Sequence, residues 1–155
     1  MIALITIGLP AAGKSTYART LEGFEELNLD ACREAVSGDA GNQDVTREAL
    51  ALRDARLAAA VAAGRPVVVS DTNLVPAHRK DLVERFRAAG YEVRLVLLDT
   101  PYDVCLARNA ARARVVPPHA MERMAAALAE HPPERCAGAL GVGLVRVSGG
   151  AGGRT

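Results

Sequence analysis

The sequence predicts an α/β fold in which a parallel sheet is sandwiched by helices. Along its 155 residues, short and almost wholly apolar segments alternate with segments of helical character, a pattern typical of strands buried on both faces. A G-x-x-x-x-G-K-[ST] motif, from Gly8 to Ser15, lies between the first apolar segment and the first helical one. Because a phosphate-binding loop requires this strand–loop–helix context, the predicted fold class is that of a P-loop NTPase.

Five segments are expected to be strands because each is short, apolar and bounded by polar or turn-forming residues. They are residues 2–7, 27–29, 66–70, 93–98 and 142–147. Asp30, Asp71 and Asp99 follow three of these segments. Since ligands bind at the carboxyl ends of the strands in such sheets, the polar chemistry is predicted at one edge of the sheet.

Six segments are expected to be helices because they carry helix-forming residues between turn signals. They are residues 15–21, 31–36, 44–63, 76–90, 101–114 and 119–130. In the longest of them, Leu50, Leu57 and Val61 share one stripe, which is expected to face the core. Pro76 suits the first turn of the helix that it begins.

The composition indicates one domain whose net charge is too small to attract nucleic acid over a long range. Hydrophobic residues make up 50% of the chain, aromatic residues 3%, and the formal net charge is +1. These values exclude an extensive base-stacking platform and leave only local contacts to a nucleic acid. We expect one domain over residues 1–148 and a flexible, Gly-rich tail over 149–155, and the sequence carries no signal of an oligomeric state.

The cysteines and the apolar segments bear on cellular location. None of the three cysteines has the spacing of a metal-binding pair. The amino terminus runs directly into the first strand, and no apolar segment approaches membrane-spanning length. We therefore expect a cytoplasmic protein with reduced thiols and no contact with a membrane.

The glycine-rich motif is expected to bind ATP and Mg²⁺. Its backbone N–H groups and the start of the following helix suit phosphate oxygens, Lys14 suits the β- and γ-phosphates, and the Ser15 hydroxyl suits Mg²⁺. The alternative is a glycine-rich turn that carries Lys-Ser by chance, but Lys14 and Lys80 are the only lysines in the chain. The expected nucleotide contacts are Gly8, Ala11, Ala12, Gly13, Lys14, Ser15 and Thr16.

Two of the aspartates are candidates for the chemistry of transfer. Asp30 is placed where a general base could face the γ-phosphate, but it could equally be the N-cap of the next helix. Asp71 follows the apolar segment 66–70, which is the layout of a Walker-B carboxylate that holds Mg²⁺ or its water. The alternative for Asp71 is a polar strand end that forms turn hydrogen bonds.

Arginines recur in the segment 101–114. Arg108 and Arg112 are four residues apart, so they are expected on one helix face, and Arg114 follows. Guanidinium groups suit the spread charge of a transferring phosphoryl group, so this segment is expected to be a helical lid over ATP. The alternative is a solvated basic helix.

Taken together, four segments resemble the kinase domain of phage-type polynucleotide 5′-kinases. They are residues 5–16, Asn-Leu-Asp-Ala-Cys-Arg at 28–33, Ser-Asp-Thr-Asn-Leu at 70–74, and Arg108-Asn109 with Arg112. The resemblance covers about residues 1–130, and the segments occur in the same order with workable spacing. Their combination is far more specific than the phosphate-binding motif alone.

For the acceptor, the resemblance implies that Asp30 is the general base on a 5′-hydroxyl group. It implies that Arg33 grips the acceptor's own phosphate, that Thr72 is a second contact there, and that Val116 contacts the acceptor base. Asp71 matches an essential strand-end carboxylate.

For the donor, the resemblance implies that Lys14 and Ser15 handle ATP and Mg²⁺. It implies that Arg112 reaches the transferring phosphate and that Arg108 lies against the adenine.

Three departures from the family pattern qualify the expected activity. The chain ends before a phosphatase domain could begin, so no 3′-phosphatase activity is expected. Ala31 stands where the family has a second carboxylate, and Cys32 stands where it has an aromatic residue.

The predicted function is ATP-dependent transfer of the γ-phosphate to the 5′-hydroxyl of a DNA or RNA end. A second hypothesis keeps the same fold and donor site but has a small-molecule hydroxyl acceptor, such as a sugar, a nucleoside or an antibiotic. A third is a nucleotide-dependent binding module that has no acceptor.

Overall fold

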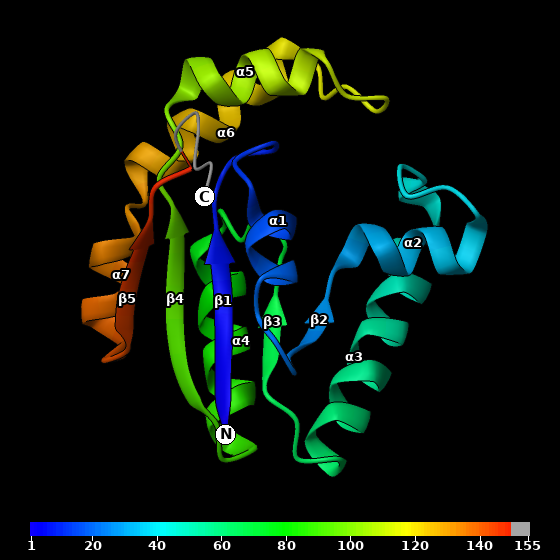
Figure 1. Ribbon diagram of the computed structural model, residues 1–155, viewed down its shortest axis with the longest axis vertical. Helices are drawn as coiled ribbons and strands as arrows, with labels where there is room; N and C mark the ends of the chain where they lie inside the picture. Colours follow the sequence, from blue (N-terminus) through cyan, green and yellow to red (C-terminus); the bar gives the residue numbers. More distant parts are fainter. Residues whose placement is uncertain (150–155) are drawn as a thin grey trace.

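A computed structural model describes residues 1–149, and its centre is a five-stranded, wholly parallel sheet (Figure 1). The strands are β1 (Ile2–Ile7), β2 (Glu25–Leu27), β3 (Val67–Val69), β4 (Glu92–Leu98) and β5 (Gly143–Val147). Their order is β2-β3-β1-β4-β5, so β1 lies between β3 and β4. The connection after β1 runs to one side of the sheet, and the connection after β3 runs to the other. The loop after β1 therefore lies at the switch point between them, which is where ligands bind in such sheets.

Helices cover both faces of the sheet. They are α1 (Lys14–Arg19), α2 (Leu29–Ser37), a 3₁₀ turn η1 (Gln43–Val45), α3 (Thr46–Ala62), α4 (Pro76–Ala88), α5 (Tyr102–Ala110), α6 (Pro118–Glu130) and α7 (Pro133–Leu140). The core on one face includes α4 and α7, and the core on the other includes α1 and α5, while α5 and α6 cross the carboxyl edge of the sheet (Figure 1). The predicted fold class, an α/β P-loop fold, is confirmed.

The three valines of β3 show why the sheet is buried on both faces. Val67, Val68 and Val69 are each at most 1% exposed, because helices pack on both sides of this strand. Hydrophobic burial therefore extends along every position of the strand, which is typical of parallel sheets. No helix within residues 1–149 is long and apolar enough to cross a membrane.

Arg79 on α4 fastens the loop that follows β3. Its guanidinium is fully buried and donates hydrogen bonds to the carbonyls of Asn73 (2.6 Å), Leu74 (3.3 Å) and His131 (2.9 Å). A buried charge is tolerated when its donors are satisfied in this way. The loop after β3 is thereby held against the carboxyl end of α6.

The predicted strand 27–29 is wrong in its position. The strand β2 ends at Leu27, and Asn28 is the N-cap of α2, where its side chain accepts a hydrogen bond from the backbone N–H of Ala31 at 2.9 Å. Asp30 therefore lies in the first turn of α2 and is not the N-cap. An N-cap asparagine ends the strand before the apolar pattern ends, because Leu29 belongs to the helix.

Three further predictions need correction. The helix predicted over 101–114 ends at Ala110, so Arg112 and Arg114 lie in the loop before α6 and do not share a helix face with Arg108. The helix α7 was not predicted, because it begins at the second of two consecutive prolines, Pro132 and Pro133, and has only 8 residues. Leu50 is 37% exposed and does not face the core, whereas Leu57 and Val61 do.

The predicted tail falls mostly outside the described residues, which end at Gly149. The carbonyl of Gly149 accepts a hydrogen bond from Nη2 of Arg108 at 2.9 Å.

Candidate active site

The loop between β1 and α1 has the backbone of a phosphate cradle. Ala11 and Gly13 have positive φ angles of 63° and 102°, which turn the chain tightly before α1 begins at Lys14. The hydroxyl of Thr100 donates to the carbonyl of Ala12 at 2.8 Å, and the backbone N–H of Gly8 donates to the carbonyl of Thr72 at 3.1 Å. Neighbouring strand ends therefore hold the loop at both its ends.

Lys14 is a buried cation whose hydrogen bonds go to neutral groups. Its ammonium donates to the carbonyls of Gly8 (3.2 Å) and Leu9 (2.6 Å), and it forms no ion pair within residues 1–149. Burial lowers the pKa of Lys14 to about 8. A polyphosphate bound at the cradle would supply the missing negative charge, so the loop fits ATP.

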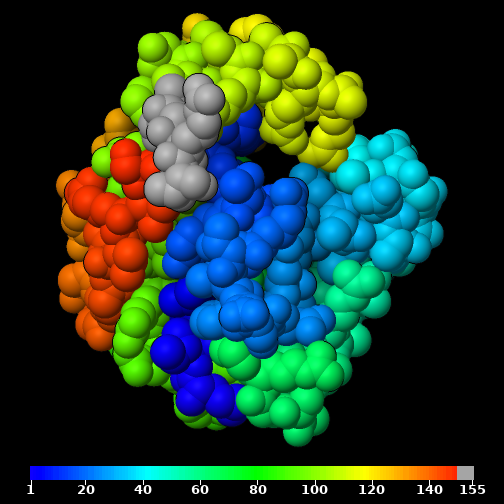
Figure 2. Space-filling model, in the orientation of Figure 1, coloured from blue at the N-terminus to red at the C-terminus, as the bar shows by residue number. Residues whose placement is uncertain are grey.

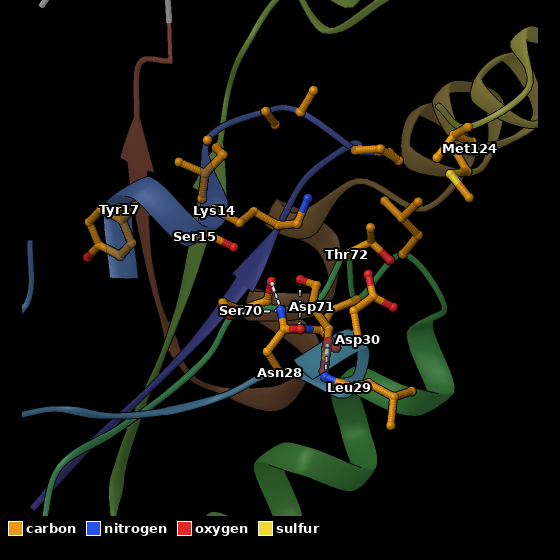
Figure 3. A pocket seen from close by; sticks show the side chains of 18 of the residues that line it. Lys14, Ser15, Tyr17, Asn28, Leu29, Asp30, Ser70, Asp71, Thr72 and Met124 are labelled. Carbon is orange, nitrogen blue, oxygen red and sulfur yellow. Dashed lines mark hydrogen bonds between the residues drawn. The ribbon is translucent and has the colours of Figure 1, made fainter. Parts of the chain in front are cut away.

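Asp71 lies at the end of β3 with one carboxylate oxygen in a hydrogen bond and the other, Oδ2, in a long ion pair at 3.6 Å from Nη1 of Arg53. Its Oδ1 accepts a hydrogen bond from the backbone N–H of Leu29 at 2.8 Å (Figure 3). Its Oδ2 is buried without a hydrogen-bond partner among the described residues, and burial raises the pKa of Asp71. An unpartnered carboxylate oxygen close to Lys14 and Ser15 fits a Mg²⁺ ion or its bound water.

The metal would take few ligands from the protein. Within residues 1–149, no three His, Cys, Asp or Glu residues cluster so as to hold a metal ion. Mg²⁺ keeps waters and phosphate oxygens as ligands, so Ser15 and Asp71 are a sufficient donor set for it.

Asp30 faces the same space from α2. Its Oδ1 accepts a hydrogen bond from Nη1 of Arg33 at 2.7 Å, and its Oδ2 accepts one from Nη2 of Arg114 at 2.9 Å. The Asp30 side chain is 44% exposed, so it can reach a ligand in the cleft. Asp30 and Thr72 lie on one side of the space into which the Lys14 ammonium points (Figure 3).

The segment 111–117 forms the tip of a lid above the cleft. The side chain of Asn109 donates to the carbonyl of Val116 at 2.7 Å and accepts from its backbone N–H at 3.0 Å, so the tip is a closed loop. Arg112 lines the same cleft as the phosphate cradle, and its charge adds to burial in lowering the pKa of Lys14. Arg114 reaches across the cleft to Asp30.

These segments enclose one cleft of about 1770 Å³. Figure 2 shows its opening between the lid tip, in yellow, and the blue and cyan surface of α1 and α2. Every predicted site residue lines it except Gly8, which directly follows β1. Sequence reasoning did not identify several other residues that line the cleft. They include His78 and Asp81 on α4, Arg123 on α6, and Gln43, Thr46 and Arg53 on η1 and α3, together with Leu50, which was assigned to the core.

A family model described as an AAA domain, AAA_33, matches residues 4–131. The chain belongs to the AAA_33 family. No curated protein matches the chain.

Three solved structures illustrate the range of proteins that share the AAA_33 fold seen here. A chain of the Pnkp1/Rnl/Hen1 RNA repair complex has a TM-score of 0.74 and 22% identity, with coverage of 86% of this chain and 45% of that one. A gluconokinase from Sinorhizobium meliloti 1021 has a TM-score of 0.60 and 24% identity, with coverage of 94% and 81%. The tunicamycin resistance protein of Deinococcus radiodurans has a TM-score of 0.55 and 21% identity, with coverage of 94% and 99%.

At these identities the likeness concerns the fold. This AAA_33 chain spans 40% and 45% of the two RNA repair chains that it matches. The fold is P-loop kinase-like, and these neighbours include a chain of an RNA repair complex and a gluconokinase.

Proposed function

We propose that this AAA_33 domain is an ATP-dependent kinase that transfers the γ-phosphate to the 5′-hydroxyl of a DNA or RNA end. The observation that carries the proposal is the pair Asp30 and Arg33, which lies across one cleft from Lys14. A carboxylate can accept the proton of a hydroxyl group, and a guanidinium beside it suits a phosphate on the same acceptor. The resemblance to polynucleotide 5′-kinases at residues 28–33 and 70–74 supports the same assignment.

We call the side of the cleft formed by Lys14 and the loop between β1 and α1 the donor wall. There the loop holds the triphosphate, and Lys14 binds its β- and γ-phosphates. Ser15 and Asp71 hold Mg²⁺, directly or through water. When bound, MgATP supplies the phosphoryl group, and the metal offsets part of its negative charge. Arg112 contacts the transferring phosphate from the lid, and Arg108 lies against the adenine.

We call the opposite side of the cleft, formed by Asp30 and Arg33 on α2, the acceptor wall. There Asp30 accepts the proton of the acceptor hydroxyl. The hydroxyl oxygen forms a bond to the γ-phosphorus while the bond between the γ-phosphorus and the bridging oxygen of the β-phosphate breaks. Arg33 and Thr72 bind the phosphate that follows the terminal nucleoside, and Val116 contacts its base. Arg114 gives up its ion pair with Asp30 when the acceptor enters, at little cost because both side chains are more than two-fifths exposed.

A small-molecule hydroxyl is the second candidate acceptor. Gluconokinase and the tunicamycin resistance protein match this fold over 94% of the chain, which favours it. Arg33 separates a polynucleotide from a neutral small molecule, because a neutral sugar or nucleoside offers no phosphate to a guanidinium. If Arg33→Ala leaves the acceptor KM unchanged, the acceptor is not a polynucleotide.

The direct test is transfer of label from γ-labelled ATP with Mg²⁺ to a short single-stranded oligonucleotide. We expect label on the oligonucleotide with a 5′-hydroxyl and none on the 5′-phosphorylated copy. Absence of label on both DNA and RNA, with ATP still bound, would overturn the proposal.

A further inference from the structure

The wall of the cleft opposite the lid is formed by one face of η1 and α3. Gln43, Thr46, Leu50 and Arg53 all line the cleft. They are spaced by three and four residues, so they lie on one helical face. Leu50 is 37% exposed to this space, a position that core packing does not require.

Arg53 is the charged member of this face and is poorly partnered. Its side chain is only 15% exposed, and its Nη1 lies 3.6 Å from Oδ2 of Asp71, which is too long for a hydrogen bond. Among residues 1–149, its guanidinium donates no hydrogen bond, and Oδ2 of Asp71 accepts none. A guanidinium carries five donors, so Arg53 has capacity for a further anion.

Arg33 on α2 shows the same feature on the neighbouring element. Its Nη1 donates to Asp30, but its Nε is buried without a partner in the part of the chain that the structure describes. Unpaired donors in a shielded site are costly unless a ligand satisfies them. Basic side chains along the cleft also outnumber the acidic ones by eight to three, so MgATP alone leaves positive charge.

We propose that Arg53, together with Arg33, binds an anionic group of the acceptor, and that Leu50 packs against the acceptor's body. The inference rests on the proposed function, since it concerns the acceptor of that transfer. The anion is a phosphate or a carboxylate, so it can belong to a nucleotide 3′ to the reacting hydroxyl or to a sugar acid. Arg53 is thus a specificity-determining residue.

The competing role for Arg53 is that of a counter-ion for Asp71 alone. In that case its loss would affect every acceptor equally, because Asp71 faces the donor site. Binding to the acceptor's anion predicts an effect that depends on whether the acceptor carries the anion. The two roles therefore differ in a measurable way.

The test compares Arg53→Met with Arg56→Met, a matched control on the same helix whose guanidinium lies 3.7 Å from Sγ of Cys32 outside the cleft. Binding to the full chain is measured by calorimetry for thymidine 3′-monophosphate, thymidine, gluconate and glucose, and for ATP. We expect Arg53→Met to weaken binding of one of the two anions at least about tenfold. Binding of its neutral partner and of ATP should not change, and Arg56→Met should behave as the wild type.

Equal losses for anionic and neutral ligands in Arg53→Met, or no loss, would overturn the inference. So would failure of the wild type to bind either anion. The proposed function fails separately if thymidine 3′-monophosphate binds through Arg53 but accepts no γ-phosphate. It also fails if gluconate alone shows the dependence on Arg53.

Discussion

The two walls of the cleft are built by different means. On the donor wall, the loop after β1 is held by backbone hydrogen bonds and buried groups, with Lys14 only 9% exposed. On the acceptor wall, Asp30 is held by ion pairs from Arg33 and Arg114, and its own side chain is 44% exposed. The donor wall belongs to the core of the sheet, and the acceptor wall lies on helices and a lid beyond it.

This difference indicates which half of the site can change. Altering the donor loop disturbs packing at the carboxyl ends of β1 and β4, so its residues are constrained by the fold as well as by ATP. The ion pair of Arg114 with Asp30 joins two exposed side chains and contributes little to stability, so this part of the acceptor wall can change without unfolding the domain.

The largest effect expected on the donor wall is that of Lys14→Met. Transfer should fall by roughly a hundredfold to a thousandfold, because one preorganised cation on the phosphates is lost. Its melting temperature at pH 7 without nucleotide should rise. The pKa of Lys14 falls from 10.5 to about 8 on folding, so the cost of burying the ammonium is fully present below pH 8 and disappears as the pH rises to 10.5.

Lys80→Met is the matched control, since Lys80 is exposed on α4 in a surface ion pair with Glu84. It should change neither transfer nor melting by a measurable amount. Full activity in Lys14→Met would contradict the assignment of the donor wall.

The next effect concerns Asp71, where the two walls meet. Asp71→Asn keeps an oxygen for the N–H of Leu29 but loses the charge for Mg²⁺, so kcat should fall about a hundredfold while stability is kept. Asp71→Ala loses the hydrogen bond as well and should lower the free energy of unfolding by about 1–2 kcal/mol. Chemical denaturation and steady-state kinetics measure the two quantities, and an Asn variant with normal kcat would remove Asp71 from the metal site.

A smaller effect is expected in the pH dependence of ATP binding. Below pH 8 Lys14 is charged, and the Kd for ATP should be nearly constant with pH. Above about pH 8 the neutral amine of Lys14 must take up a proton when ATP binds, so the Kd should rise by up to about tenfold per pH unit. Calorimetric titrations of the wild type and of Lys14→Met test this, and the same slope in both would assign the effect to another group.

The smallest effect is expected for Arg114→Ala on the acceptor wall. Its ion pair with Asp30 joins two exposed side chains, so the free energy of unfolding should change by less than about 1 kcal/mol. The acceptor KM should change much less than in Arg33→Ala. Thermal melting and acceptor titrations measure both, and an effect equal to that of Arg33→Ala would mean that Arg114 itself binds the acceptor.

The sequence predicted the donor wall well because its chemistry is local. The loop, Lys14 and Ser15 are adjacent in the chain, and the apolar strand before them sets their place in the fold. The parallel sheet followed from the apolar segments, and Asp71 followed from its position after β3. Their catalytic and metal-binding roles stay predictions.

The acceptor wall was predicted less completely because it depends on which way helices face. The alanine-rich α3 has no clear apolar face, so Leu50 was assigned to the core and Arg53 was overlooked. The spacing of residues 43, 46, 50 and 53 could have revealed a cleft-facing stripe, but only once the place of α3 was known. Similarly, the end of α5 at Ala110 depends on Asn109 closing the lid tip onto Val116.

The central claim is that one cleft binds ATP on one wall and activates an acceptor hydroxyl on the other. Asp30→Asn tests it most directly, with the Kd for ATP and the turnover on a 5′-hydroxyl oligonucleotide measured on the same preparation. We expect turnover to fall between about a hundredfold and ten-thousandfold while the Kd for ATP is unchanged. Unchanged turnover would contradict the claim, and a wild type that binds ATP but phosphorylates no acceptor would point to a nucleotide-dependent binding module.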